Sequence, residues 1–252
     1  VEHPVALVLG TGLGHLANLV KPVRRIDYRD IEGFPVDAQP VTGHSFEATI
    51  GTIDGVPVVV YPGRVHLYQG YSAAEVTALV QHAHHLGCRD IIFAGATGAV
   101  PGNAGTGLGI ITDQINLTGT NPLAEWASLK NVETPFVDMN DAYSPYLRTL
   151  ARGVADDLGI TVEEGVFAGL LGPNFETPAE VNMLRAMNVS YTGVSTALEV
   201  IMARALNMNV LGLTLAANPA GARGTTHKSV LEAAEHYADD FERLVRGILR
   251  LL

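Results

Sequence analysis

The 252-residue sequence contains one cysteine, Cys88, so no disulfide can form within the chain. Charged residues make up only 17% of it, and acidic residues outnumber basic ones to give a net charge of -10. This balance argues against a nucleic-acid partner, because nucleic acid favours a basic surface. Any anion site must therefore be local and built from a few placed groups.

Long apolar runs are also missing. The longest apolar stretches fall far short of a membrane span, and we expect no membrane partner. The first ten residues, VEHPVALVLG, show neither a basic region nor a cleavage-site pattern, so we expect no signal peptide and a cytoplasmic enzyme. No internal repeat, low-complexity linker or charge block divides the chain, which predicts one domain over residues 1–252.

Short apolar runs alternate with helical patterns, and a hydrophobic content of 47% is enough for a large core. Two of the runs flank Asp54 and Gly55, a strong hairpin signal. The expected strands are residues 5–10, 47–51, 56–61, 90–96, 109–117, 162–170 and 209–217. The expected helices are residues 72–86, 143–158, 177–187, 196–206 and one long amphipathic helix over 227–252. This order predicts an α/β three-layer sandwich, with helices flanking a central sheet that the hairpin makes mixed.

A glycine-rich turn, LGTGLGHL at residues 9–16, follows the first strand. Such a turn presents free N–H groups and the Thr11 hydroxyl to a phosphate. The spacing is GxGxG and not the dinucleotide pattern GxGxxG, although Asp30 lies twenty residues after Gly10. A phosphate loop, a dinucleotide site and a tight structural turn all remain open for this stretch.

The stretch GRVHLYQGY, residues 63–71, leaves the end of a buried strand. Arg64, His66 and Tyr68 alternate, so on an extended chain they share a face. Arginine offers a planar fork that suits phosphate oxygens, and histidine can donate a hydrogen bond to them. The sequence therefore predicts an anion site here, in preference to a solvated strand end.

Two further stretches combine helix caps with candidate ligands. In GPNFETPAE, Thr177 and Glu180 fit a capping box, which leaves Phe175 and Glu176 as a ring and an acceptor suited to a flat heterocycle. In GVSTALEV, Ser195 or Thr196 would cap a helix, and a hydroxyl at that position also suits phosphate.

The segment HAHHLGC suggests a metal site, because His84 and Cys88 are four residues apart. It lacks a carboxylate partner and lies inside a helical pattern. An exposed or interfacial helix face is the favoured interpretation, so no metal is predicted.

Over nearly its whole length the chain resembles the trimeric purine nucleoside phosphorylases, the class that acts on 6-oxopurine nucleosides. The resemblance rests on GTGLG, GHSFEATIG, GRVHLYQGY, DQINLTGTNPL, DMNDAYS, GPNFETPAE and STALEVIMARA. It implies phosphate-dependent cleavage of the N-glycosidic bond of inosine or guanosine, or of their deoxy forms, to free base and pentose 1-phosphate. It also implies a homotrimer, with phosphate as co-substrate and no cofactor or metal.

The resemblance assigns roles residue by residue. Phosphate would be held by Thr11, His44, Arg64, His66, Ser195 and the backbone N–H of Ala96. Ribose would be contacted by Tyr68, Val194, His227 and, from a neighbouring subunit, Phe136. The base would be bound by Phe175, Glu176 and Asn218. Asn218, Glu176 and His66 would be the catalytic residues.

The chain departs from the family pattern in the segment AGATGA, residues 94–99, where Gly95 replaces Asn and Thr97 replaces Ala. Val194 stands at a usual Met, and the segment from Asn218 to His227 is short. Three alternatives stay open: a methylthioadenosine phosphorylase of the same fold, a purine-binding protein with little turnover, which the altered segment suggests, and a dinucleotide-binding oxidoreductase.

Overall fold

The computed structural model of the chain describes residues 3–42, 44–133 and 135–252. Four residues lie outside the described part of the chain: Val1, Glu2, Gly43 and Thr134. The first two belong to the segment VEHPVALVLG, in which no signal peptide is expected, and Gly43 is the first residue of GHSFEATIG. Among the described helices, none combines the length and the apolar character needed to cross a bilayer.

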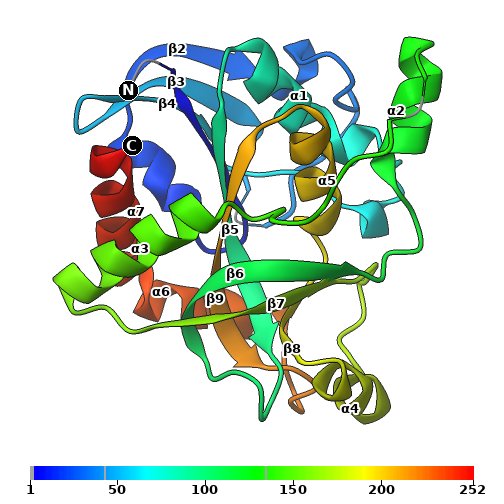
Figure 1. The fold of residues 1–252 in the computed structure, drawn as a ribbon, viewed down its shortest axis with the longest axis vertical. Coiled ribbons are helices and arrows are strands. Elements are labelled where there is room, and N and C mark those ends of the chain that lie inside the picture. The colour runs from blue at the N-terminus through cyan, green and yellow to red at the C-terminus, as the bar shows by residue number, and fades with distance from the viewer. Residues whose placement is uncertain (1–2, 43, 134) are drawn as a thin grey trace.

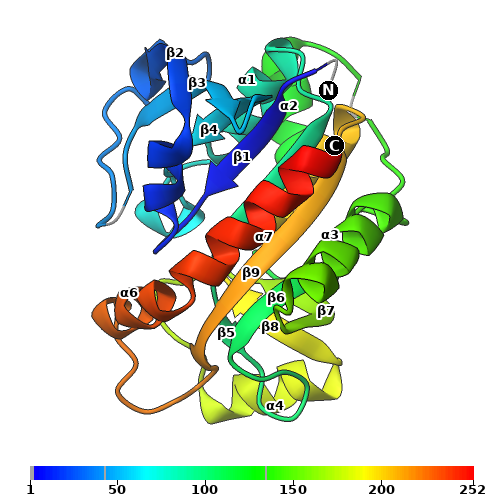
Figure 2. The same cartoon turned by 90° about the vertical axis from the view of Figure 1, so that its left-hand side faces the viewer.

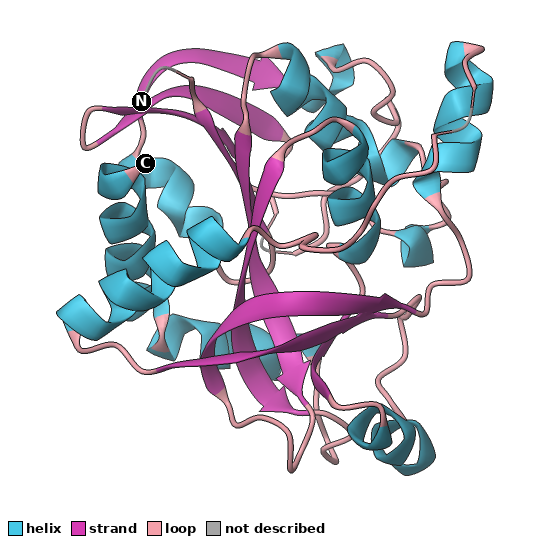
Figure 3. Ribbon diagram, viewed as in Figure 1, coloured by secondary structure: helices cyan, strands magenta, loops and turns pink. Residues whose placement is uncertain are grey.

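A single mixed sheet forms the centre of the molecule (Figures 1 and 3). Within the described residues its strand order is β2-β3-β4-β1-β5-β8-β7-β6-β9, and β9 also pairs with β5, so the last five strands in that order close on themselves. The strands are β1 (Val5–Leu9), β2 (Lys21–Asp27), β3 (Glu47–Ile53), β4 (Val56–Tyr61), β5 (Asp90–Ala99), β6 (Gly107–Asn116), β7 (Val162–Gly169), β8 (Val189–Gly193) and β9 (Asn209–Pro219).

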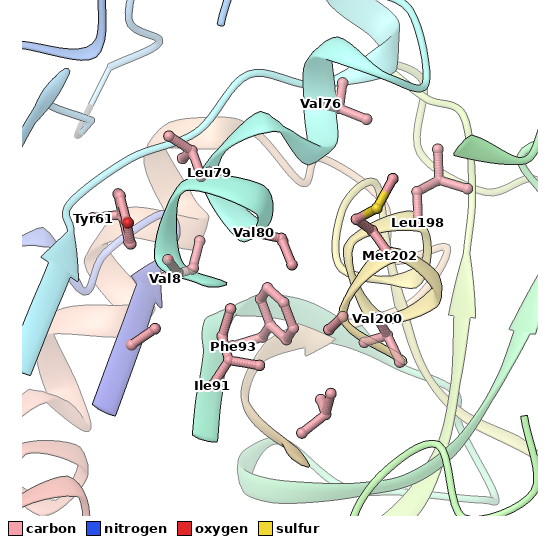
Figure 4. Packing of buried hydrophobic residues seen from close by; sticks show 14 of the residues in the cluster. Val8, Tyr61, Val76, Leu79, Val80, Ile91, Phe93, Leu198, Val200 and Met202 are labelled. Carbon is pink, nitrogen blue, oxygen red and sulfur yellow. The ribbon is translucent and has the colours of Figure 1, made fainter. Parts of the chain in front are cut away.

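Helices cover both faces of the sheet. They are α1 (Ala78–His85), α2 (Pro122–Lys130), α3 (Pro145–Leu158), α4 (Pro178–Ala186), α5 (Ala197–Ala205), α6 (His227–His236) and α7 (Ala238–Leu251). Short 3-10 turns occupy Gly14–Leu19, Tyr28–Asp30, Leu67–Gln69 and Glu75–Thr77. Helices α3 and α7 lie side by side on one face (Figure 2), and α1 and α5 pack on the other (Figure 4).

The alternation of side chains along the strands explains these layers. In β1, Ala6 and Val8 are buried with residues of α1 and α5, whereas Leu7 and Leu9 are buried with residues of α3 and α7. Both faces of the strand are apolar, as expected for a sheet covered on two sides. The predicted three-layer α/β sandwich with a mixed sheet is confirmed.

The predicted hairpin is confirmed too, since β3 and β4 pair antiparallel around Asp54 (φ 51°) and Gly55 (φ 86°). The long C-terminal helix predicted over residues 227–252 is wrong in extent. It is two helices, separated at Tyr237 (φ -103°, ψ 3°). With this break, α6 packs against β9 while α7 packs along α3.

The topology leaves an opening on one edge of β5. Strand β1 pairs with that strand as far as Ala94, opposite Leu9, and β8 pairs with it from Gly98, opposite Thr192. Strand β9 runs along its other edge throughout. On the edge of β5 that pairs with β1 and β8, residues 95–97 therefore have no strand partner within the described chain. Ligands of α/β proteins bind at such switch points, where neighbouring strands part.

Candidate active site

A cavity of about 310 Å³ opens at this switch point. Its wall includes loops that follow β1, β4, β7 and β8, together with the end of β9 and the start of α6. Most of the residues predicted from the sequence line it: Thr11, His66, Tyr68, Ala96, Phe175, Glu176, Val194, Asn218 and His227. Segments far apart in the sequence thus meet around one space.

The end of the cavity at Thr11 and Ala96 lies next to the glycine turn that contains Gly10 and Gly12, which we call the glycine floor. A Cβ on Gly10 would lie 3.1 Å from Nη2 of Arg64, and a Cβ on Gly12 (φ 83°) would overlap Ala234 of α6. These two glycines are thus required by the close approach of a guanidinium and of a helix. The tight turn thereby brings Thr11 to the cavity wall.

Arg64 lies beneath this floor and not on the cavity wall. Its side chain is 1% exposed, and Nη1 donates to Oε2 of Glu199 at 2.6 Å. Nη2 donates to the carbonyl oxygens of Ala94 at 3.0 Å and Val8 at 3.4 Å. The guanidinium therefore ties β1, β5 and the start of α5 together, and only Nε is left without a partner among its nitrogens.

Glu199 was not singled out in the sequence, although it lies within the STALEVIMARA motif. It is buried, and Oε2 also accepts a hydrogen bond from the backbone N–H of Thr196 at 2.8 Å. Thr196 (φ 70°) is the N-cap of α5, so the carboxylate fixes the turn in which Ser195 sits. The capping-box spacing from Thr196 to Glu199 is the pattern from which this role could have been predicted.

His66 lies at the centre of the anion end and is almost completely buried. Its ring stacks on Tyr68, with centroids 4.9 Å apart and planes 19° apart, and lies 5.5 Å from the ring of His44. Burial lowers the pKa of His66 to about 3, and the positive charge of Arg64 acts in the same direction. Burial and Arg64 likewise lower the pKa of His44 to about 4, so both rings are neutral at pH 7.

The other end of the cavity offers a ring, a carboxylate and an amide. Phe175 is half exposed at the rim, and Glu176 lies beside it. Nδ2 of Asn218 donates a hydrogen bond to the carbonyl oxygen of Pro219 at 3.0 Å. Sequence reasoning missed Thr192 on this wall, because nothing marked the short strand β8. It noted Thr97 only as a departure from the family pattern, yet Thr97 is part of the wall as well.

The remaining predicted residues lie around the cavity. Ser195 lines a separate small cavity of about 20 Å³ beside His66 and Glu199. His44 lies behind His66 and contacts the backbone of Arg64 through Nδ1. Phe136 is fully exposed, away from this cavity.

His227, at the start of α6, closes the rim. Its Nε2 lies 3.3 Å from the carbonyl oxygen of Thr42, which links α6 to the loop before β3. The predicted capping box of α4 is also confirmed, since Thr177 and Glu180 exchange hydrogen bonds of 2.7 and 3.2 Å.

In the segment HAHHLGC, the buried side chains make contacts within the fold. Nδ1 of His82 lies 2.7 Å from the hydroxyl of Tyr61, and Cys88 is buried in the core. Across residues 3–42, 44–133 and 135–252, no group of three or more metal-ligating side chains gathers anywhere.

Residues 4–250 match the model of the phosphorylase superfamily. The chain is 41% identical to purine nucleoside phosphorylase 1 of Geobacillus stearothermophilus over 98% of its own length and 90% of the relative's. It is 34% identical to the purine nucleoside phosphorylase of Mus musculus, over 96% of this chain and 86% of that one.

Solved structures agree in fold. A Schistosoma purine nucleoside phosphorylase in complex with hypoxanthine superposes with a TM-score of 0.84 at 29% identity, covering 99% of this chain and 91% of that one. The Schistosoma mansoni enzyme in complex with adenosine gives 0.86 at 30% identity, with the same coverage. The chain therefore belongs to the phosphorylase superfamily, in the family of the purine nucleoside phosphorylases.

Proposed function

We propose that this chain is a purine nucleoside phosphorylase that acts on 6-oxopurine nucleosides, and that residues 1–252 work as one catalytic domain. Phosphate would displace the base from the anomeric carbon and yield free purine and pentose 1-phosphate. The observation that carries the proposal is the convergence in one cavity of the glycine floor at Thr11 and Ala96 with the base-reading set of Phe175, Glu176 and Asn218.

The anion end supports phosphate binding by neutral donors. Because the charge of Arg64 is balanced by Glu199 below the floor, a phosphate here would be held by the Thr11 hydroxyl and backbone N–H groups near Ala96. Tyr68 and Val194 line the same cavity, and we expect them to contact the pentose.

The chemistry requires no nucleophile from the protein, because phosphate itself attacks. The transition state resembles an oxocarbenium ion, as in glycoside hydrolysis, and negative charge grows on the departing purine. Asn218 can donate to N7 or O6 of that purine, and Glu176 can accept from N1–H. Holding phosphate and nucleoside in line supplies a large part of the acceleration. The absence of a cofactor and the cytoplasmic location stay predictions.

Glu176 favours a 6-oxopurine over a 6-aminopurine. A carboxylate accepts from N1–H of hypoxanthine or guanine, whereas it repels the bare N1 lone pair of adenine. A methylthioadenosine phosphorylase of the same fold remains the second candidate, and a preference for adenosine over inosine would move it ahead.

We also propose that the working unit is a homotrimer. The full exposure of Phe136 supports this, because a bare aromatic ring at a loop tip gains by burial against another surface. In an assembly it would complete the ribose end of a neighbour's cavity.

The deciding experiment measures hypoxanthine release from inosine with and without phosphate, in the presence of a chelator. We expect release to rise with phosphate concentration and to yield ribose 1-phosphate. A Glu176→Ala variant serves as the control for a contaminating activity. Release that is equal without phosphate would indicate hydrolysis, and no release with either would favour a binding protein.

A further inference from the structure

Three neighbouring strands place a hydroxyl group, a bare backbone and an amide in one row on the cavity wall. Thr192 of β8 pairs with Gly98 of β5, and Gly98 pairs on its other side with Asn218 of β9. Residues that pair directly across two strands point to the same face of a sheet. All three residues line the cavity, so this face of the row borders the space in which the base would bind.

Gly98 keeps the middle of the row open. A Cβ at this position would lie 2.9 Å from Oγ1 of Thr192, so the hydroxyl group leans toward Gly98, the side on which Asn218 lies. Two strand spacings separate the backbones of Thr192 and Asn218 by about 10 Å. A flat heterocycle over Gly98 would therefore meet Asn218 at one edge and the Thr192 hydroxyl at the opposite edge.

The hydroxyl group of Thr192 is available to a ligand. The residue is 2% exposed, and its Oγ1 makes no hydrogen bond within residues 3–42, 44–133 and 135–252. Its partner in β7 is Ala168, which offers only a methyl group. The oxygen is not fully enclosed, unlike Nε2 of His44 or Oε1 of Glu199, and the space that it borders is the cavity. Because buried hydroxyl groups normally have a hydrogen-bond partner, we expect the ligand to supply one.

Thr97 lines the same cavity but differs in this respect. Its Oγ1 lies 2.6 Å from Oγ1 of Thr214, which is buried behind the wall. Thr214 also donates to the carbonyl oxygen of Gly95 at 3.3 Å. The hydroxyl group of Thr97 is thus engaged within the fold, whereas that of Thr192 is left for the ligand.

We propose that Thr192 is a specificity-determining residue, whose hydroxyl group accepts a hydrogen bond from the 2-amino group of guanine and so favours guanosine over inosine. This inference rests on the proposed function, which places N7 and O6 of the purine against Asn218. The opposite edge of the base carries C2, so the row directs C2 toward Thr192. Guanine bears an amino group at C2, and hypoxanthine bears a hydrogen atom.

The direction of the preference follows from hydrogen-bond balance. A threonine oxygen has two lone pairs and can accept from an amino group. A 2-amino group that entered the cavity without an acceptor would lose its hydrogen bonds to water and gain none, which weakens binding. The C2–H group of hypoxanthine needs no partner, so the Thr192 hydroxyl contributes to guanosine and little to inosine.

Substitution by valine tests the role of the hydroxyl group, because it exchanges the hydroxyl for a methyl group of similar size. In Thr192→Val the ratio of kcat/KM for guanosine to kcat/KM for inosine should fall about three- to tenfold, as expected for one lost hydrogen bond. The change should lie in the Michaelis constant for guanosine, since the amino group is held equally in the ground state and the transition state. Thr192→Ser keeps the hydroxyl group and should keep the ratio.

Thr97→Val is the matched control, because it removes a hydroxyl group that Thr214 already engages. It should leave the ratio unchanged. Thr192→Ala also deletes the Thr192 hydroxyl and serves as the second variant if the valine variant does not fold. An equal loss for both nucleosides in a folded Thr192 variant would assign a structural role to the hydroxyl group and overturn the inference.

Calorimetric binding of guanine and hypoxanthine in the absence of phosphate separates this inference from the proposed function. We expect tighter binding of guanine in the wild type and a smaller difference in Thr192→Val. Absence of phosphorolysis in the wild type would remove the proposed function, while the binding ratio would still decide the role of Thr192. Equal affinity of the wild type for the two bases would overturn the role of Thr192 alone, even in an active phosphorylase.

Discussion

Arg64 and Glu199 are buried together beneath the anion end of the cavity, so neither charge can lose its partner without penalty. We predict that Arg64→Met destabilises the fold by about 3–5 kcal/mol, because it leaves a buried carboxylate unpaired. The double variant Arg64→Met, Glu199→Met should recover most of that loss, as measured by urea unfolding.

Arg152→Met is the matched control, since its pair with Glu164 is largely exposed and should matter little. Were Arg64 instead a direct phosphate ligand with no structural role, its loss would raise the phosphate Michaelis constant at unchanged stability. That outcome would contradict the geometry described here.

The base end of the cavity makes a prediction about substrate choice. Wild-type enzyme should prefer inosine to adenosine by a wide margin. Glu176→Gln should narrow the ratio of kcat/KM values, because an amide can donate to the bare N1 of adenine. Asn218→Asp should shift preference toward adenosine, because a carboxylate can accept from the 6-amino group. An unchanged ratio in Glu176→Gln would remove Glu176 as the base reader.

Because His44 and His66 are buried and neutral, we predict that the free energy of unfolding falls in mild acid. Their folded pKa values, about 4 and about 3, lie below the unfolded value of 6.5, so the unfolded chain takes up more protons between these limits. This stability is fully present above pH 6.5 and falls as the pH drops, by at most about 1.4 kcal/mol per pH unit for each histidine.

Urea unfolding between pH 7 and pH 5 measures that slope. His44→Asn and His66→Asn should each make it shallower, and the same replacement at the exposed His84 serves as the control. A slope unchanged in both buried-site variants would show that these rings do not lose their protons on folding.

At the scale of the element, Gly12 joins the glycine turn to α6. An alanine here would overlap Ala234, and its φ of 83° is strained for any residue with a side chain. In the wild type, α6 supplies His227 and Val230 to the cavity wall. We predict that Gly12→Ala displaces this helix and raises the Michaelis constant for inosine several-fold.

The chain offers both a rescue and a control for this variant. Adding Ala234→Gly removes the clash and should restore inosine binding, while the backbone strain remains. Gly55→Ala has a similar φ of 86° with no atom within 4 Å of the new methyl, so it should lower stability without affecting the cavity. If Ala234→Gly does not restore inosine binding, the effect of Gly12→Ala is not transmitted through α6.

The elements that the sequence predicted are those with clear local patterns. The β3–β4 hairpin follows from Asp54 and Gly55, and α4 begins at its capping box. Strand β2 was missed because it is mostly exposed and rich in charge, and β8 because it has only five residues. The burial of Arg64 could not be predicted, since it depends on Glu199, which is 135 positions away along the chain.

At the scale of the whole molecule, the family resemblance and the exposed ring of Phe136 together lead us to predict an assembly with shared sites. Ultracentrifugation should give a mass three times that of the chain. Glu176→Ala and Phe136→Ala should each reduce inosine cleavage alone, and refolding the two together should restore part of it. Complementation arises because some sites then combine an intact Glu176 with a neighbour's intact Phe136.

Dilution of the purified enzyme to a demonstrated monomer is the second arm of that test. Full activity in the monomer would contradict the shared site. A lack of complementation between two variants that do co-assemble would contradict it as well.

The cavity wall joins Thr11, near the start of this sequence, to His227 and Val230, near its end. Strand β9 must also lie along β5, more than a hundred residues earlier, before the wall exists. On the ribosome the chain emerges from its N-terminus, so the cavity wall stays incomplete until the residues of α6 have left the exit tunnel. A nascent chain that stops upstream of α6 would therefore lack the part of the cavity wall that His227 and Val230 supply.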